Sequence, residues 1–116
     1  MPIENERKYV LDLQSCDKLE TSLKNLNCVK TQISQYYLDQ NNRLRCCKTA
    51  EELHYEFCFK KNVLGNVVEI QTVIDLADFN LLKSECDSKI IKDRYYLDDR
   101  NYCWEIDFIK DSSNLS

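Results

Sequence analysis

The sequence predicts an α+β domain in which a largely antiparallel sheet is accompanied by two helices. The chain has 116 residues, the size of one domain with a single modest core. Hydrophobic residues make up 43% of the chain and charged residues 31%, so a core is expected rather than global disorder. Most segments alternate apolar and polar residues, as strands do, and only two repeat with the period of a helix.

The expected elements follow in order along the chain. Strands are expected at 3–13, 31–39, 42–49, 53–61, 67–74, 89–97 and 102–110. A helix capped by Ser15 is expected to run to about Asn27, and a second to start at Asp75 and end near Cys86. Turn-forming residues cluster at 39–42, 62–66 and 98–101, where hairpins are expected. Residues 1–110 are interpreted as the domain and 111–116 as a frayed tail.

Composition weighs against several classes of function. The net charge of −4 argues against general nucleic-acid binding, although an RNA 5′-triphosphate end stays open as a ligand. With Gly65 as its one glycine, the chain cannot form a glycine-rich phosphate loop. No apolar run approaches the roughly 18 residues of a membrane span, and the N-terminus lacks the apolar stretch of a signal peptide. A cytoplasmic protein with no membrane partner is therefore expected.

Seven cysteines are many for this length. Their number is odd and no CxxC occurs, so we interpret them as reduced thiols that serve as small apolar residues, rather than as disulfides or zinc ligands. His54 is the only histidine and cannot by itself build a His-rich metal site. A catalytic Cys–His pair that uses it remains an alternative.

Charged residues share one face of the expected strands, and largely apolar residues take the other. An ordinary sheet with one solvated face would show the same alternation. The charges, however, come as basic doublets on some strands, at 43/45 and 92/94, and as acidic doublets on others, at 4/6 and 105/107. If the sheet curls so that these faces converge, it forms a tunnel with a cationic and an acidic wall. Such a site suits a polyanion and a divalent cation, with the apolar faces turned outward beneath the helices.

A series of motifs, in order over residues 3–110, resembles the CYTH domains, also called triphosphate tunnel metalloenzymes. The ExExK opening of the family resembles Glu4-Asn5-Glu6-Arg7-Lys8, its Q-G-Y-L segment resembles Gln35-Tyr36-Tyr37-Leu38, and its RxR resembles Arg43-Leu44-Arg45. In the middle of the chain, the T-x-K motif resembles Phe57-Cys58-Phe59-Lys60, and part of the R-x-E-x-E motif resembles Val68-Glu69-Ile70-Gln71. Near the end, the K-x-R-Y motif resembles Lys92-Asp93-Arg94-Tyr95, and the W-E-I-D motif resembles Trp104-Glu105-Ile106-Asp107.

The resemblance implies an antiparallel β-barrel tunnel that binds triphosphate compounds together with Mg²⁺ or Mn²⁺. The phosphate-binding residues that it implies are Lys8, Arg43, Arg45, Lys60, Lys92 and Arg94. The metal ligands that it implies are Glu4, Glu6, Glu69, Glu105 and Asp107, and the residues implied in catalysis are Tyr37 and Lys8.

The chain departs from the family pattern in two places. Around Glu69 the family has an Arg and two Glu, whereas this chain has Val67, Glu69 and Gln71. The family pattern also continues into a further strand that carries an E-x-E metal ligand, whereas this sequence stops at Ser116. The tunnel is therefore expected to be open on one side or completed by a second subunit, in a homo-oligomer.

The leading functional expectation is metal-dependent hydrolysis of inorganic triphosphate or of a nucleoside triphosphate. The alternative is a non-catalytic module that sequesters a triphosphate or nucleotide, because the reduced set of acidic residues weakens catalysis more than binding. An adenylyl cyclase, for which nothing marks a purine pocket, and a purely structural domain are the remaining hypotheses.

Overall fold

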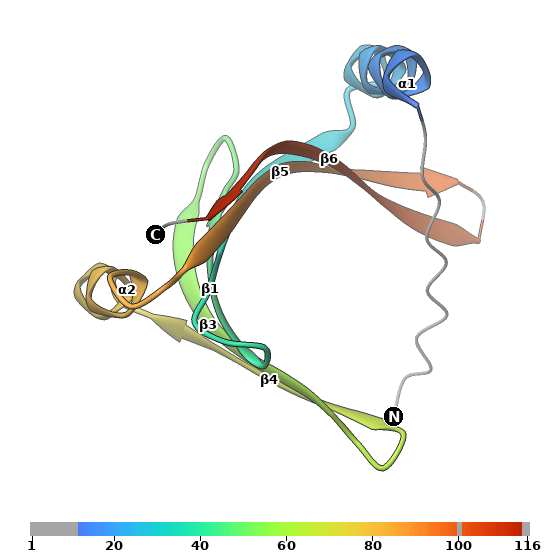
Figure 1. Ribbon diagram of the computed structural model, residues 1–116. Helices are drawn as coiled ribbons and strands as arrows, with labels where there is room; N and C mark the ends of the chain where they lie inside the picture. Colours follow the sequence, from blue (N-terminus) through green and yellow to red (C-terminus); the bar gives the residue numbers. More distant parts are fainter. Residues whose placement is uncertain (1–11, 100, 115–116) are drawn as a thin grey trace.

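The computed structural model describes residues 12–99 and 101–114, which form an α+β domain (Figure 1). Its elements in chain order are α1 (Leu13–Asn25), β1 (Val29–Tyr37), β2 (Asn42–Lys48), β3 (Leu53–Val63), β4 (Asn66–Ile74), α2 (Leu76–Lys83), β5 (Ser88–Asp99) and β6 (Tyr102–Asn114). The predicted class, and the order of the elements from the first helix onward, are confirmed.

The six strands form one antiparallel sheet in the order β4-β3-β2-β1-β5-β6. Within the described residues the sheet is open, with β4 and β6 as its edges, so the predicted seven-stranded tunnel is not confirmed. Most of the expected first strand, 3–13, lies outside the described residues. At its last two positions, Asp12 has an extended backbone and serves as the N-cap of α1, and Leu13 begins the helix.

Both helices begin at an aspartate cap. The Asp12 carboxylate accepts the backbone N–H of Ser15 at 2.7 Å. The prediction that Ser15 caps this helix is therefore wrong, and Ser15 is a residue of its first turn. The prediction for α2 is confirmed, because Asp75 accepts the N–H of Asp78 at 2.8 Å. Both helices are shorter at their C-terminal ends than expected, since α1 ends at Asn25 and α2 at Lys83.

The hairpin turns lie where the turn-forming residues predicted them. Between β1 and β2, the Asp39 carboxylate accepts the N–H groups of Asn41 and Asn42, each at 2.8 Å. Between β3 and β4, Leu64 and Gly65 take positive φ angles of 53° and 82°, the left-handed region that glycine occupies without strain. The last strand differs from the prediction: β6 continues to Asn114 and pairs with β5 there, so residues 111–114 are not a frayed tail.

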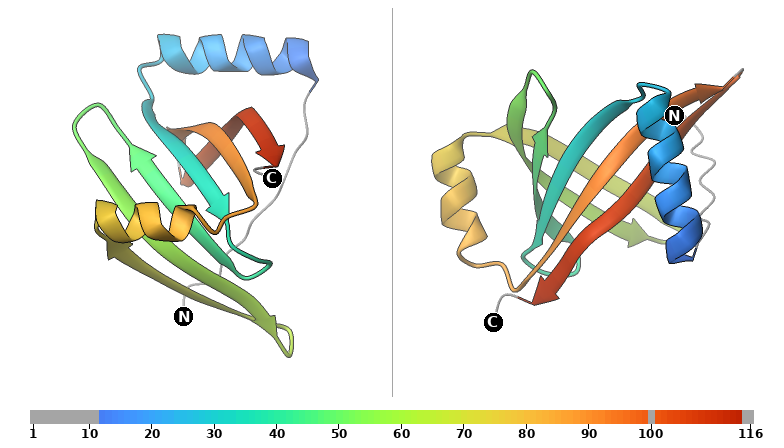
Figure 2. Two further views of the ribbon diagram at one scale, coloured as in Figure 1. Left: turned by 60° about the vertical axis from the view of Figure 1, so that its left-hand side comes forward. Right: turned by 90° about the horizontal axis from the view of Figure 1, so that it is seen from above.

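The sheet is strongly curved, and both helices lie on its convex side (Figures 1 and 2). Under α1, Leu23 packs with Tyr95 and Phe108, and under α2, Phe79 packs with Leu44. Because alternate residues of a strand point to opposite faces, the side chains at 43, 45, 60, 92 and 94 project from the opposite, concave face. The predicted arrangement, with apolar faces outward beneath the helices and charged faces together, is present in the described strands.

Candidate functional site

Five basic side chains from three strands share the concave face of the sheet. They come from β2 (Arg43, Arg45), β3 (Lys60) and β5 (Lys92, Arg94). The central strand β1 carries Tyr37 opposite Arg43 and Gln35 opposite Arg45 on the same face. All the described residues for which the resemblance implies phosphate binding therefore lie on one surface.

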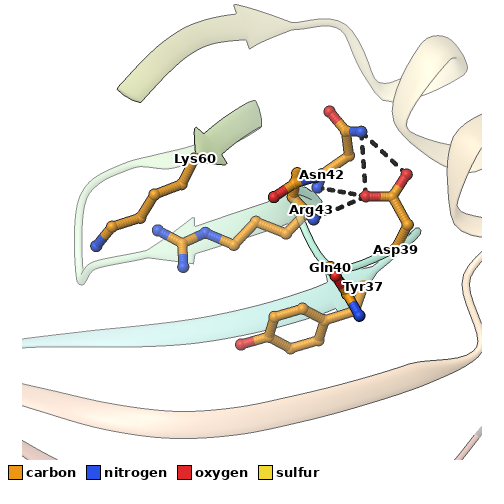
Figure 3. A pocket seen from close by; sticks show the side chains of 7 residues that line it. Tyr37, Asp39, Gln40, Asn42, Arg43 and Lys60 are labelled. Atoms are coloured by element: carbon orange, nitrogen blue, oxygen red, sulfur yellow. Dashed lines mark hydrogen bonds between the residues drawn. The ribbon is translucent and has the colours of Figure 1, made fainter. Parts of the chain in front are cut away.

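A small pocket of about 100 Å³ lies at one end of this face, beside the β1–β2 turn (Figure 3). Tyr37, Arg43 and Lys60 line it together with residues 39–42 of the turn. The guanidinium of Arg43, the ammonium of Lys60 and the hydroxyl of Tyr37 all extend in the same direction, away from the turn (Figure 3). The Asp39 carboxylate is occupied by the turn itself, so the cations are the charges that a ligand would meet here.

The basic side chains near this pocket have few internal partners. Among the described residues, no carboxylate lies within 4.0 Å of the charged ends of Lys60 or Arg45, and Arg43 reaches Glu69 only at 3.9 Å. The Nε of Arg43 is buried, and no acceptor in the described part of the chain reaches it. Arg45 faces a neutral group, the buried amide of Gln35. In the orientation of this amide that satisfies both its oxygen and its nitrogen, the oxygen accepts from Arg45 Nη2 at 2.9 Å and from Nε at 3.3 Å. These cations therefore have unused capacity for an anion.

The basic side chains of β5 are, by contrast, bound to acidic residues of β6. Arg94 donates to Asp107 from Nε at 2.7 Å and from Nη2 at 3.0 Å, a bidentate pair. Lys92 lies 3.0 Å from the same carboxylate, and Arg94 Nη1 lies 3.5 Å from Glu105. An anion that binds Lys92 and Arg94 must therefore compete with Asp107 or join it.

The ion pairs decide the charge states in this network. Burial alone would raise the pKa of Asp107, but hydrogen bonds from Arg94 and then Lys92 outweigh it and hold that pKa below its ordinary value of 3.8. Burial lowers the pKa of Lys92, and the hydrogen bond to Asp107 opposes this shift. The hydrogen bond from Asp107 raises the pKa of Arg94. Asp107 is thus an anion at neutral pH, engaged by two cations.

The implied metal ligands are not brought together by the described residues. Glu4 and Glu6, together with Lys8, lie outside the described part of the chain. Glu69 lies on β4 and both Glu105 and Asp107 on β6, the two opposite edges of the sheet. In the described residues these three carboxylates do not form a common group, and Asp107 is already bound by two cations. The described carboxylates therefore do not fit a Mg²⁺ or Mn²⁺ site by themselves.

A different group of potential ligands is present that the motifs do not indicate. The Sγ of Cys47, a ring nitrogen of His54 and a carboxylate oxygen of Glu56 all lie within 4.8 Å of one another on the concave face. The signal in the sequence was the His-x-Glu spacing at 54 and 56, which places both side chains on one face of a strand. The third member follows only from the strand register, which places Cys47 opposite His54.

Comparisons of the chain with protein-family models, with curated proteins and with solved structures found no match. No helix in the described residues is long and apolar enough to cross a membrane.

Proposed function

We propose that the concave face binds the triphosphate group of a small molecule, inorganic triphosphate or a nucleoside triphosphate. The observation that carries the proposal is the gathering of Arg43, Arg45 and Lys60 on adjacent strands with little internal neutralisation. Like charges held close together repel one another, and a multiply charged anion relieves that repulsion. Guanidinium groups fit phosphate oxygens through paired hydrogen bonds, and an ammonium adds a point charge.

The pocket beside the β1–β2 turn is the proposed centre of binding. Arg43 and Lys60 line it, and Arg45 lies two residues farther along β2 on the same face. Lys92 and Arg94 project from the same concave face on β5, separated from β2 by β1, and are the proposed contacts for the other end of the triphosphate. Because Asp107 engages these two side chains, their share of the binding free energy is expected to be smaller than that of the Arg43–Lys60 pair.

Hydrolysis of the bound triphosphate is the second proposal, and the position of Tyr37 favours it. This residue, implied in catalysis by the resemblance, lines the same pocket as Arg43 and Lys60. Bound Mg²⁺ or Mn²⁺ would supply neutralisation of the phosphate charge. Glu4 and Glu6, the best-matched ligands for it, lie outside the described residues. Binding is the better-supported function, since it depends only on described side chains.

The proposed location is the cytoplasm, as a reducing compartment. Six of the cysteines are not joined in disulfides in the structure, namely Cys28, Cys46, Cys47, Cys58, Cys86 and Cys103. Thiols in this number persist where glutathione and thioredoxin keep them reduced.

A matched pair of variants tests the binding surface. Lys60→Ala and Lys61→Ala remove the same charge from neighbouring, exposed positions of β3, but the two side chains project from opposite faces. We expect calorimetric titration with inorganic triphosphate to show a loss of roughly tenfold or more for Lys60→Ala, since a charge-assisted contact contributes about 1.5–3 kcal/mol. Lys61→Ala should change affinity by less than about threefold, through long-range charge alone. Equal effects of the two variants would show that only net charge matters and would exclude the concave site.

Turnover separates the two proposed functions. A hydrolase would release phosphate from triphosphate with Mg²⁺ or Mn²⁺ and would lose this activity in EDTA. Glu6→Gln should then abolish turnover but keep binding, because the basic residues remain. A wild-type protein that binds triphosphate and shows no metal-dependent phosphate release would establish the binding module instead.

A further inference from the structure

We propose that Cys47, His54 and Glu56 form a zinc site on the concave face, distinct from the carboxylate site that the resemblance implies. The three donors are a thiol, an imidazole and a carboxylate, each a ligand type that Zn²⁺ takes in proteins, and three protein ligands leave the fourth position of a tetrahedral site open. Their ligand atoms already lie within 4.8 Å of one another. His54 Nε2 lies 3.0 Å from Glu56 Oε1.

The strand register preorganises this group. Cys47 and His54 are directly opposed in the β2–β3 pair, and Glu56 lies two residues along β3 on the same face. Zinc–ligand bonds of about 2.0–2.3 Å in tetrahedral geometry place the donor atoms about 3.3–3.7 Å apart. Because the ligand atoms lie within 4.8 Å of one another, shifts of these atoms by about 1 Å, through side-chain rotation, bring them to such separations.

Accessibility and charge also favour an ion here, and bound Zn²⁺ would favour the thiolate of Cys47 against the burial that raises its pKa to about 11. Cys47 is only 8% exposed, whereas the side chains of His54 and Glu56 are 40% and 19% exposed, so an ion has a path from solvent and a shielded thiol to bind. On binding, the Cys47 thiol releases its proton to the buffer, and the resulting thiolate and the Glu56 carboxylate neutralise the two charges of Zn²⁺. The fourth position is left to water or to an oxygen of an anion, with Arg45 nearby on the same face as Glu56.

The neighbouring cysteine supplies a matched control. Cys46 precedes Cys47 in β2, and its side chain packs on the convex face against the cluster of Phe79 and Leu44. Cys58 lies on the concave face, two residues beyond Glu56, and is fully buried. A thiolate ligand from either of these residues instead of Cys47 would contradict the assignment.

The test is titration of the full chain with Co²⁺ and then Zn²⁺ in buffer without phosphate. We expect one equivalent of Co²⁺ to produce the thiolate-to-cobalt charge-transfer band and the intense visible bands of a tetrahedral site, and Zn²⁺ to abolish them. Cys47→Ser should lose the charge-transfer band, whereas Cys46→Ser and Cys58→Ser should keep it. His54→Ala and Glu56→Gln should weaken zinc binding by roughly tenfold or more.

Two results would overturn the proposal: no saturable Co²⁺ binding by wild type, or an unchanged band in Cys47→Ser. If Cys47→Ser fails to fold, as judged by circular dichroism, His54→Ala at a partly exposed position decides the question, and unchanged zinc affinity there refutes the site. The measurement contains no triphosphate. Its outcome is therefore independent of the triphosphate titration, and either proposal can fail without the other.

Discussion

Replacing Asp107 by Asn tests whether this carboxylate neutralises the neighbouring cations of the concave face when no ligand is bound. Asp107 holds the bidentate pair with Arg94 and the ion pair with Lys92, whose side chains are only 18% and 15% exposed. Asn keeps the shape of the side chain but removes the charge that both cations face. Breaking a fully buried pair costs about 3–5 kcal/mol. Because the Asp107 side chain is 30% exposed, we expect about 1–3 kcal/mol of destabilisation here.

Thermal and urea unfolding give the measurement. At about 4 °C per kcal/mol for a domain of this size, the melting temperature should fall by roughly 4–12 °C. The control is Asp111→Asn, which removes a carboxylate from a more exposed pair with Lys89, at 3.5 Å on the same two strands. That variant should lose less than about 1 kcal/mol. Equal stability of Asp107→Asn and wild type would refute the view that Asp107 holds the two cations.

The effect should depend on pH in a defined direction. The pKa of Asp107 is lowered in the folded state, so its stabilising contribution is complete above the unfolded value of about 3.8 and is lost as pH falls through the folded pKa. The difference in unfolding free energy between wild type and Asp107→Asn should therefore be constant near neutrality and shrink below about pH 3.8. A difference that persists undiminished in acid would point to shape rather than charge as its cause.

The same variant should bind triphosphate more tightly. Loss of the carboxylate releases Lys92 and Arg94 and removes one negative charge that the phosphates would meet. A charge at about 4 Å contributes about 1 kcal/mol even at the dielectric constant of water, so we expect about a fivefold gain in affinity. Weaker binding by Asp107→Asn would mean that Asp107 supports the ligand instead of competing with it.

Three further predictions follow from the packing. Leu23→Ala should cost about 2–4 kcal/mol in urea unfolding, because Leu23 is buried between α1 and the sheet, whereas Leu26→Ala, exposed, should change stability by less than about 0.5 kcal/mol. Tyr95→Phe should cost about 1 kcal/mol, since the Tyr95 hydroxyl donates to Glu20 at 3.1 Å, and equal stability would mean that this bond contributes nothing. Homo-oligomers should form through β4, which is an edge of the sheet within the described residues and carries the exposed Ile70. Light scattering should report dissociation in Ile70→Lys, and a wild-type monomer at high concentration would contradict this.

Features that depend on neighbours along the chain could be predicted from the amino-acid sequence. Alternation placed Arg43 with Arg45, and Lys92 with Arg94, on common faces, because the period of a strand is two whatever its partners are. The Asp75 cap and the Asp39 turn were equally predictable, since each is a carboxylate that accepts N–H groups two or three residues away. The sequence favours Ser15 as the cap of α1, whereas Asp12 is the cap in the structure, because several polar residues there can each serve as a cap.

Features that depend on pairing between distant segments become visible in the folded protein alone. The strand order places Glu69 and Asp107 at opposite edges of the sheet. These two residues, which the family motifs both imply as metal ligands, therefore do not form one group in the described part of the chain. The β5–β6 register sets Asp107 against Arg94. The β2–β3 register sets Cys47 against His54, and no local pattern could indicate this, because a shift of one residue would turn Cys46 to that face instead. The register is specified by the burial of a whole face of the sheet beneath two helices. The hydrophobic free energy of this burial is gained only when the strands and helices have assembled.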